Sequence, residues 1–198
     1  MNEYEKQLRA TTIGEPQRVD GHIFLAEYDP AWPGAFEREA ARIRQALGDR
    51  ALLVEHAGST SVPGLAAKPR IDIVLALPDS SAEDDYVPPM EAAGYELRIR
   101  EPDWHEHRVF KRADAEVNVH VFTVGCSEIE RMLRFRDWLR ANPADRDLYL
   151  AKKRELAPRD WEFVQQYADE KGELVEQILV RAGAPSSNPS EKETPRKR

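Results

Sequence analysis

The sequence predicts an α/β (α+β) protein in which a mixed β-sheet is followed by a helical segment. Two observations carry this prediction. Short apolar runs and alternating apolar and polar residues, both typical of strands, mark the chain up to Thr123. Helical spacing, with apolar residues three or four positions apart, dominates from Ser127 onward. The expected parts are an N-terminal arm (1–22), an α/β domain (23–125), a C-terminal helical part of the same unit (126–182) and a disordered tail (183–198).

The first half of the α/β domain is expected to hold strands and one long amphipathic helix. Asp29 and Pro30 end an opening strand, and Gly48 ends the helix. Pro78 stops the most apolar strand, which is expected to be central in its sheet. In chain order the predicted elements are a strand over 23–28, a helix over 32–47, strands over 51–58 and 70–78, and a helix within 81–95 with Gly94 as its C-cap.

The second half of the domain contains two more predicted strands, and helices follow them. The later strand alternates, so Asn118 and His120 share one face while its three valines share the other. Ser127 and Glu130 predict the start of a helix with a capping box. The predicted elements are strands near 107–112 and over 116–123, a helix from Ser127, a helix over 147–157 stopped by Pro158, and a long last helix from Trp161 to Ala182.

Composition and charge narrow the class of protein. The 198 residues are 41% hydrophobic and 33% charged, which is ordinary for a globular protein with its own core. A formal net charge of −7 argues against nucleic acid as a partner. The single cysteine, Cys126, excludes an internal disulfide, the sequence has no membrane-spanning apolar run, and we expect no signal peptide. We expect a cytoplasmic protein with a small-molecule substrate and no membrane contact, and its oligomeric state stays open.

The stretch that carries the most chemistry is VEHAGSTSVPGLAAKPRIDIVLAL, residues 54–77. Its glycines, hydroxyls and lysine suggest a phosphate-binding loop, but a Walker A loop needs a lysine directly after its second glycine. Here Gly64 is followed by Leu65, and Lys68 is followed by Pro69. The dinucleotide-binding pattern Gly-x-Gly-x-x-Gly is absent as well. Neither kind of phosphate site is therefore expected.

The motif of polymerase-β-type nucleotidyltransferases fits this stretch better. In that motif a Gly-Ser pair and loop amides hold a triphosphate, and an Asp-x-Asp pair on the next strand holds Mg²⁺, which prefers oxygen ligands. Gly58 and Ser59 match the pair, and Asp72 matches the second carboxylate, whereas Arg70 stands at the first. A third carboxylate normally lies on a neighbouring strand, and on that strand of this chain Asn118 and His120 face the same side as Glu116.

Four segments together resemble the GrpB family of bacterial proteins. The similarity runs from about Ile23 to Leu179, and it implies the nucleotidyltransferase fold with a single carboxylate as a family feature. Some members of that family are fused to dephospho-CoA kinase, and members commonly have His-x-His where this chain has Asn118-Val119-His120. The segments are YDPAW (28–32), EHAGSTSVPGLAAKPRIDIV (55–74), VNVHVF (117–122) and RFRDWLRANPADRDLYLAKKRELA (134–157).

The expected site combines this loop with the strands beside it. Asp72 and His120 are the candidate catalytic residues and the candidate ligands of Mg²⁺ or Mn²⁺. Simpler roles stay open, with the serines as helix caps, Asp72 in a salt bridge and His120 as a structural histidine. The candidates for binding the phosphates of ATP or another nucleoside triphosphate are Gly58, Ser59, Thr60, Ser61, Lys68, Arg70 and Arg108.

Three functions follow as alternatives. The first is transfer of a nucleotidyl group from a nucleoside triphosphate to a small-molecule acceptor. The second is a non-catalytic nucleotide-binding, anion-binding or regulatory module, because Lys68 and Arg70 beside Asp72 weaken metal binding and strengthen anion binding. The third is an ATP-dependent ligase or condensing enzyme that acts through an adenylate.

Overall fold

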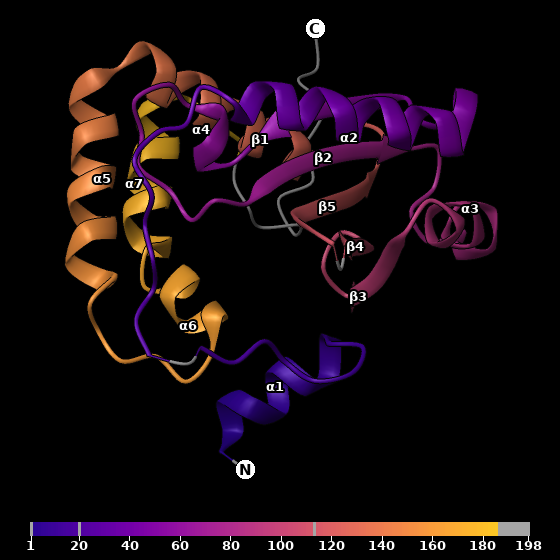
Figure 1. Ribbon diagram of the computed structural model, residues 1–198, viewed down its shortest axis with the longest axis horizontal. Helices are drawn as coiled ribbons and strands as arrows, with labels where there is room; N and C mark the ends of the chain where they lie inside the picture. Colours follow the sequence, from indigo (N-terminus) through magenta and orange to yellow (C-terminus); the bar gives the residue numbers. More distant parts are fainter. Residues whose placement is uncertain (1, 20, 113, 186–198) are drawn as a thin grey trace, which may run out of the picture.

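The computed structural model describes residues 2–19, 21–112 and 114–185. It shows a five-stranded mixed sheet flanked by helices, with a helical group at one end (Figure 1). The α+β class predicted from the sequence is confirmed. Residues 186–198 of the predicted disordered tail lie outside the described residues. No helix in the described part combines the length and the apolar character that crossing a membrane requires.

The sheet has the strand order β1-β2-β5-β4-β3, and only β2 and β5 run parallel to each other. This pairing sets Asp72 opposite Asn118. The elements are α1 (Glu3–Thr11), α2 (Trp32–Leu47), η1 (Gly48–Arg50), β1 (Leu53–Ala57), η2 (Ser59–Ser61), β2 (Ile71–Leu77), η3 (Glu83–Asp85), α3 (Val87–Ala92), β3 (Tyr95–Glu101), β4 (His107–Arg112), β5 (Ala115–Thr123), α4 (Ser127–Ala141), α5 (Pro143–Leu156), α6 (Val164–Asp169) and α7 (Gly172–Arg181).

The two faces of the sheet have different coverings because the strands alternate. Odd-numbered residues of β2 and β5, such as Ile73 and Val119, pack against α2 and α3 in the main core. On the other face Val74 and Phe122 pack under α4. Asp72, Asn118 and His120 belong to this second face, so the polar side chains stand on the side shared with the C-terminal helices.

The predicted strand over 23–28 is wrong. Only Ala26 pairs there, through two backbone hydrogen bonds with Ala67 of 2.8 and 2.9 Å. Among the residues that the structure describes, no strand pairs with the rest of the segment, so its apolar side chains do not have to alternate between two faces of a sheet. Ile23 packs against Leu156 of α5, whereas Phe24 is 71% exposed.

Two predictions about the C-terminal helices are also wrong. The long last helix is divided into α6 and α7, with Gly172, a poor helix former, as the first residue of α7. The capping box at Ser127 does not form, because α4 is capped at Cys126 without a side-chain bond and Glu130 pairs with Arg134 instead.

The structure contains two elements that the sequence analysis does not predict. Strand β3 alternates the apolar residues Tyr95, Leu97 and Ile99 with charged ones and forms one edge of the sheet. Helix α1 lies within the N-terminal arm and is capped by the Asn2 side chain. The chain after α1 then bonds to both β3 and the segment before α6, so the arm joins the sheet to the helical half.

Candidate functional site

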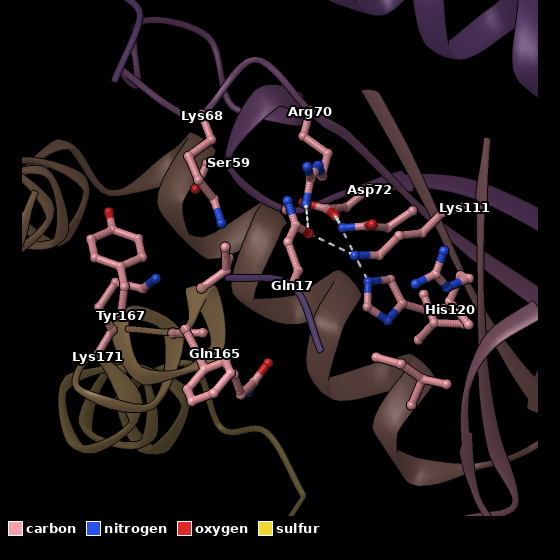
Figure 2. Close-up of a pocket in the computed structure, with 18 of the residues that line it drawn as sticks. Gln17, Ser59, Lys68, Arg70, Asp72, Lys111, His120, Gln165, Tyr167 and Lys171 are labelled. Carbon is pink, nitrogen blue, oxygen red and sulfur yellow. Dashed lines mark hydrogen bonds and ion pairs between the residues drawn. The ribbon is translucent and has the colours of Figure 1, made fainter. Parts of the chain in front are cut away.

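A cavity of about 420 Å³ lies between the second face of the sheet and the helical half (Figure 2). The sheet contributes its floor, α5 and α6 contribute one wall, and the N-terminal arm contributes another. The polar residues around it are Thr12, Glu15, Gln17, Ser59, Thr60, Lys68, Arg70, Asp72, Arg98, Lys111, Asn118, His120, Tyr149, Lys153, Gln165, Tyr167 and Lys171.

The Gly-Ser loop reaches the cavity because residue 58 has no side chain. Gly58 has φ 64° and ψ −172°, a backbone conformation that is essentially restricted to glycine. A Cβ atom on this residue would lie 2.5 Å from Oδ2 of Asp72. Ser59 and Thr60 line the cavity, whereas Ser61 does not and donates its hydroxyl to the Gly58 carbonyl at 2.6 Å. The loop is therefore held directly against Asp72.

Asp72 is the carboxylate on the cavity floor. Its Oδ1 accepts a 2.8 Å hydrogen bond from Nδ2 of Asn118 and lies 3.8 Å from Nε2 of His120. Burial alone would raise the pKa of Asp72, but His120, the Asn118 amide and the charge of Lys68 together lower it below the usual value. Asp72 is therefore an anion at neutral pH.

His120 continues into a second histidine on the neighbouring strand. Nδ1 of His120 lies 3.1 Å from Nε2 of His107, and Nδ1 of His107 lies 2.7 Å from Oε2 of Glu101. Burial lowers the pKa of His107 to about 4, although the Glu101 carboxylate acts in the opposite direction. His107 is therefore neutral at pH 7.

Three lysines face the cavity without a carboxylate partner. Lys68, Lys153 and Lys171 form no ion pair within the described part of the chain. The ammonium groups of Lys68 and Lys171 lie 5.6 and 3.7 Å from the ring centroid of Tyr167, and that of Lys153 donates to the Ala66 carbonyl at 2.5 Å. The lysines are thus directed by aromatic faces and backbone rather than by neutralising charges.

Burial and repulsion from neighbouring cations lower the pKa values of all three lysines. For Lys153 and Lys171 burial is the larger cause, nearby Lys68 adds to it, and the pKa falls to about 7 in each case. Burial, followed by the charge of Arg70, lowers the pKa of Lys68. Positive charge held apart from water and from counter-charges favours the binding of an anion.

Arg70 and Lys111 meet the N-terminal arm on the other side of the cavity. Arg70 forms an ion pair with Glu116 at 2.5 Å, so its charge is already compensated. Lys111 and Arg70 both donate to Oε1 of Gln17, at 2.8 and 3.3 Å (Figure 2). Burial, together with the charge of Arg70, lowers the pKa of Lys111 to about 8.

Arg108 lies apart from the other predicted phosphate-binding residues. Its side chain is 5% exposed and pairs with Glu83 at 2.6 Å and with Glu106 at 3.1 Å. The alternation of β4 explains this placement, since Val109 and Lys111 line the cavity and Arg108 faces the opposite side.

The predicted Mg²⁺ or Mn²⁺ site does not fit the donors that the structure brings together. Asp72 and His120 approach each other, but the described residues contain no group of three or more His, Cys, Asp or Glu side chains placed to hold a metal. Lys68 and Arg70 add positive charge near the single carboxylate, and one of its oxygens already accepts from Asn118. Mg²⁺ stays a prediction for an ion that a bound triphosphate would bring with it.

The sequence patterns do not predict five of the residues that line the cavity, namely Lys153, Lys171, Lys111, Tyr149 and Gln17. Lys153 and Tyr149 are four positions apart on α5, a spacing that places both on one helix face, and this signal is visible in the sequence. Lys171 and Gln17 have no such signal, because only the packing of α6 and the arm brings them to the cavity.

Two buried histidines make the protein sensitive to mild acid. Burial lowers the pKa of both His56 and His107 to about 4, whereas an unfolded chain protonates histidine near pH 6.5. Between these values the unfolded state binds more protons, so the free energy of unfolding falls as the pH falls. From pH 7.5 to pH 5 we expect a loss of about 2 kcal/mol per histidine, measured by urea unfolding. The variant His56→Gln should lose about half of this dependence, and equal stability at both pH values would contradict the assignment.

Comparison with known proteins identifies the family. The family model described as GrpB protein matches residues 22–181. The UPF0157 protein BH1888 of Halalkalibacterium halodurans is 58% identical, and the alignment covers 91% of this chain and 92% of that protein. The UPF0157 protein SCO7215 of Streptomyces coelicolor is 45% identical, over 87% of this chain and 89% of that protein. A dephospho-CoA kinase of Mycolicibacterium paratuberculosis is 36% identical over 76% of this chain, but only 43% of the kinase is covered.

A solved structure has a similar fold. The crystal structure of conserved protein GrpB from Enterococcus faecalis aligns with a TM-score of 0.70 and 35% identity, covering 80% of this chain and 96% of that chain. The resemblance predicted from the sequence is confirmed. The chain belongs to the GrpB family.

Proposed function

We propose that the cavity binds the phosphates of a nucleoside triphosphate, with ATP as the first candidate, and that a nucleotidyl group passes to a small-molecule acceptor. The observation that supports this proposal is the convergence of Lys68, Lys153 and Lys171, without carboxylate partners, on a cavity that also contains Asp72 and Ser59. A triphosphate would supply negatively charged partners for these lysines. It would enter as its Mg²⁺ complex.

In this reaction some residues would bind the phosphates and others would move a proton. The lysines bind the phosphates, and Ser59 with the loop amides holds them beside Asp72. The oxygen or nitrogen of the acceptor forms a bond to the α-phosphorus, the bond from that phosphorus to the bridging oxygen of the β-phosphate breaks, and pyrophosphate leaves. The proton of the acceptor passes to Nε2 of His120, and Asp72 stabilises the imidazolium that results.

The test separates binding from chemistry. Isothermal titration with ATP, with and without Mg²⁺, should show binding that is lost when the phosphates are removed, since adenosine does not engage the lysines. Pyrophosphate release in the presence of mixed small hydroxyl and amine acceptors should depend on Asp72 and disappear in Asp72→Asn. If ATP does not bind, the proposal fails at its first step.

A second candidate is metal-independent anion binding without turnover. The observation that favours it is that Asp72 accepts from an amide, Asn118, and shares the cavity with Lys68 and Arg70, whereas the described residues hold no cluster of metal-binding side chains there. The ligand would then be a nucleotide, a coenzyme A precursor or another phosphorylated metabolite. Tight binding without Mg²⁺ and without pyrophosphate release would support this candidate. Release of AMP together with an amide product would instead indicate an adenylate-forming ligase.

Anion binding should weaken as the pH rises. Lys153 and Lys171 have pKa values of about 7 and Lys111 of about 8, so the cavity loses positive charge between pH 6 and pH 9. Sulfate is a suitable probe because its charge is constant over this range. A fixed sulfate concentration should raise the melting temperature more at pH 6 than at pH 9. An equal shift at both pH values would contradict a lysine-based anion site.

A further inference from the structure

Four side chains form a continuous line across four strands of the sheet. Asp72 lies on β2, His120 on β5, His107 on β4 and Glu101 on β3. The three successive heavy-atom distances are 3.8 Å, 3.1 Å and 2.7 Å. The line therefore leads from the cavity floor to the far edge of the sheet.

The contact between the two histidines is a hydrogen bond in the plane of the rings. Their rings are parallel to within 6°, with centroids 5.3 Å apart. Rings stacked face to face could not also bring two nitrogens to 3.1 Å at this separation, whereas coplanar rings joined edge to edge do so. One nitrogen must consequently donate a proton and the other must accept it.

The carboxylate at the end of the line sets the direction of both bonds. Ionised Glu101 can only accept, so Nδ1 of His107 carries a proton and donates it. The His107 imidazole is buried against Phe122 and Trp104, which disfavours its charged form, so its Nε2 has a lone pair and accepts. Nδ1 of His120 must then carry the donated proton. Ionised Asp72 can also only accept, but it lies 3.8 Å from Nε2 of His120, beyond hydrogen-bond distance, so it does not hold a proton there. Nε2 is then the nitrogen that can gain or lose one.

Packing fixes the orientation of the His107 ring, so its two nitrogens keep their hydrogen-bond partners. Its side chain is 7% exposed. Its ring stacks on that of Phe122, with the centroids 4.6 Å apart, and lies edge-on to Trp104, with the centroids 5.1 Å apart. The two residues before it, His105 and Glu106, have φ values of 57° and 49°. Such backbone strain is uncommon outside glycine and is found where the surrounding structure fixes a functional geometry.

We infer that Glu101 and His107 are positioning residues that fix the tautomer of His120, so that its Nε2 lone pair points at the cavity. The inference deepens the proposed function and rests on it for the identity of the reaction. Nε2 and the Asp72 carboxylate then offer two acceptors 3.8 Å apart at the cavity, which suits an acceptor substrate with an O–H or N–H group, an alcohol or an amine. As the new bond to phosphorus forms and pyrophosphate leaves, the proton of that group moves to Nε2.

The tautomer can be measured without any substrate. The chain has five histidines, so ¹⁵N signals of the imidazole rings can be resolved by NMR and assigned to His120 by their loss in His120→Asn. In the wild type, at a pH where His120 is neutral, Nδ1 should show the shift of a protonated nitrogen and Nε2 that of an unprotonated one. The reverse pattern would overturn the inference.

A variant at the far end of the line should reverse the order. Glu101→Lys replaces an acceptor with a group that only donates, so His107 would accept at Nδ1 and donate at Nε2, and neutral His120 would carry its proton on Nε2. Glu101 is 30% exposed in its side chain on an edge strand, so the larger residue has room. Glu101→Gln removes the charge but keeps a carbonyl, and it should retain the wild-type tautomer. An unchanged His120 tautomer in Glu101→Lys would contradict the inference.

A kinetic measurement separates this inference from the proposed function. If nucleotidyl transfer is detected, Glu101→Lys should lower kcat about 100-fold, the usual contribution of a proton-transfer group, and leave ATP affinity within about twofold. If no transfer is detected but NMR shows the expected tautomer, the proposed reaction is contradicted. The role of Glu101 and His107 in fixing the tautomer of His120 then still stands. If the wild type transfers a nucleotidyl group but its His120 has the reverse tautomer, the proposed reaction stands and the positioning role of Glu101 and His107 is overturned.

Discussion

Replacing Lys153 and Lys171 together with methionine is expected to lower the affinity for ATP at least 100-fold. Both lysines line the cavity and neither pairs with a carboxylate in the described part of the chain. A hydrogen bond to a charged group contributes about 1.5–3 kcal/mol, so losing two removes about 3–6 kcal/mol of binding free energy. Isothermal titration at pH 6, where both ammonium groups are charged, measures the difference directly.

The same double variant should unfold at a higher temperature than the wild type. Removing two buried charges relieves their desolvation, which we expect to raise the free energy of unfolding by about 1–3 kcal/mol at pH 6. Loss of the Lys153 bond to the Ala66 carbonyl offsets part of this gain. The matched control is Lys6→Met with Lys152→Met, which removes the same charge from exposed pairs with Glu3 and Glu155. Equal ATP affinity in the two double variants would show that the cavity lysines do not bind the phosphates.

Replacing Gly58 with alanine is expected to destabilise the protein by about 2–5 kcal/mol. A left-handed backbone costs a residue with a Cβ about 1–2 kcal/mol, and overpacking costs about 1–3 kcal/mol more. Here the added Cβ would lie 2.5 Å from Oδ2 and 3.0 Å from Cβ of Asp72. Neither atom is the end of a long flexible side chain, so β2 or the loop must shift. Urea unfolding measures the loss, and ATP binding should fall with it because the loop and Asp72 are forced apart.

Gly48 provides the control for this variant. It has φ 57°, close to the 64° of Gly58, but a Cβ there would have nothing within 4 Å. Gly48→Ala should therefore cost only the backbone term, about 1–2 kcal/mol, without an effect on ligand binding. If the two variants lose the same stability, the close approach of Gly58 to Asp72 has no energetic consequence.

The sheet part of the site could be predicted from the sequence, and the reason is local. Gly58, Ser59 and Asp72 lie within fifteen residues of one another in a single loop and strand, and the alternation of β5 places Asn118 and His120 on one face. Only the pairing of β2 with β5 had to be assumed to bring the two groups together. The structure has that pairing, with Asp72 opposite Asn118.

The helical part of the site could not be predicted in the same way. Lys171 reaches the cavity because the last helical segment divides before Gly172, and Gln17 reaches it because the arm bonds to both halves of the protein. These placements depend on packing between distant segments, which no local period reveals. Arg108 shows the opposite error, since its charge suggested a phosphate contact but its strand position directs it to Glu83.

The order of the strands along the chain has a consequence for how the site assembles during folding. β3, β4 and β5 follow one another and pair antiparallel, whereas Asp72 and Asn118 are 46 residues apart and meet only through the parallel pairing. Short-range pairings form sooner, because closing a longer loop costs more entropy. Glu101, His107 and His120 are therefore expected to align within a three-stranded unit before β2 delivers Asp72. A chain arrested at that stage would have its histidines ordered against Glu101 but would lack the Asp72 carboxylate on the cavity side of His120.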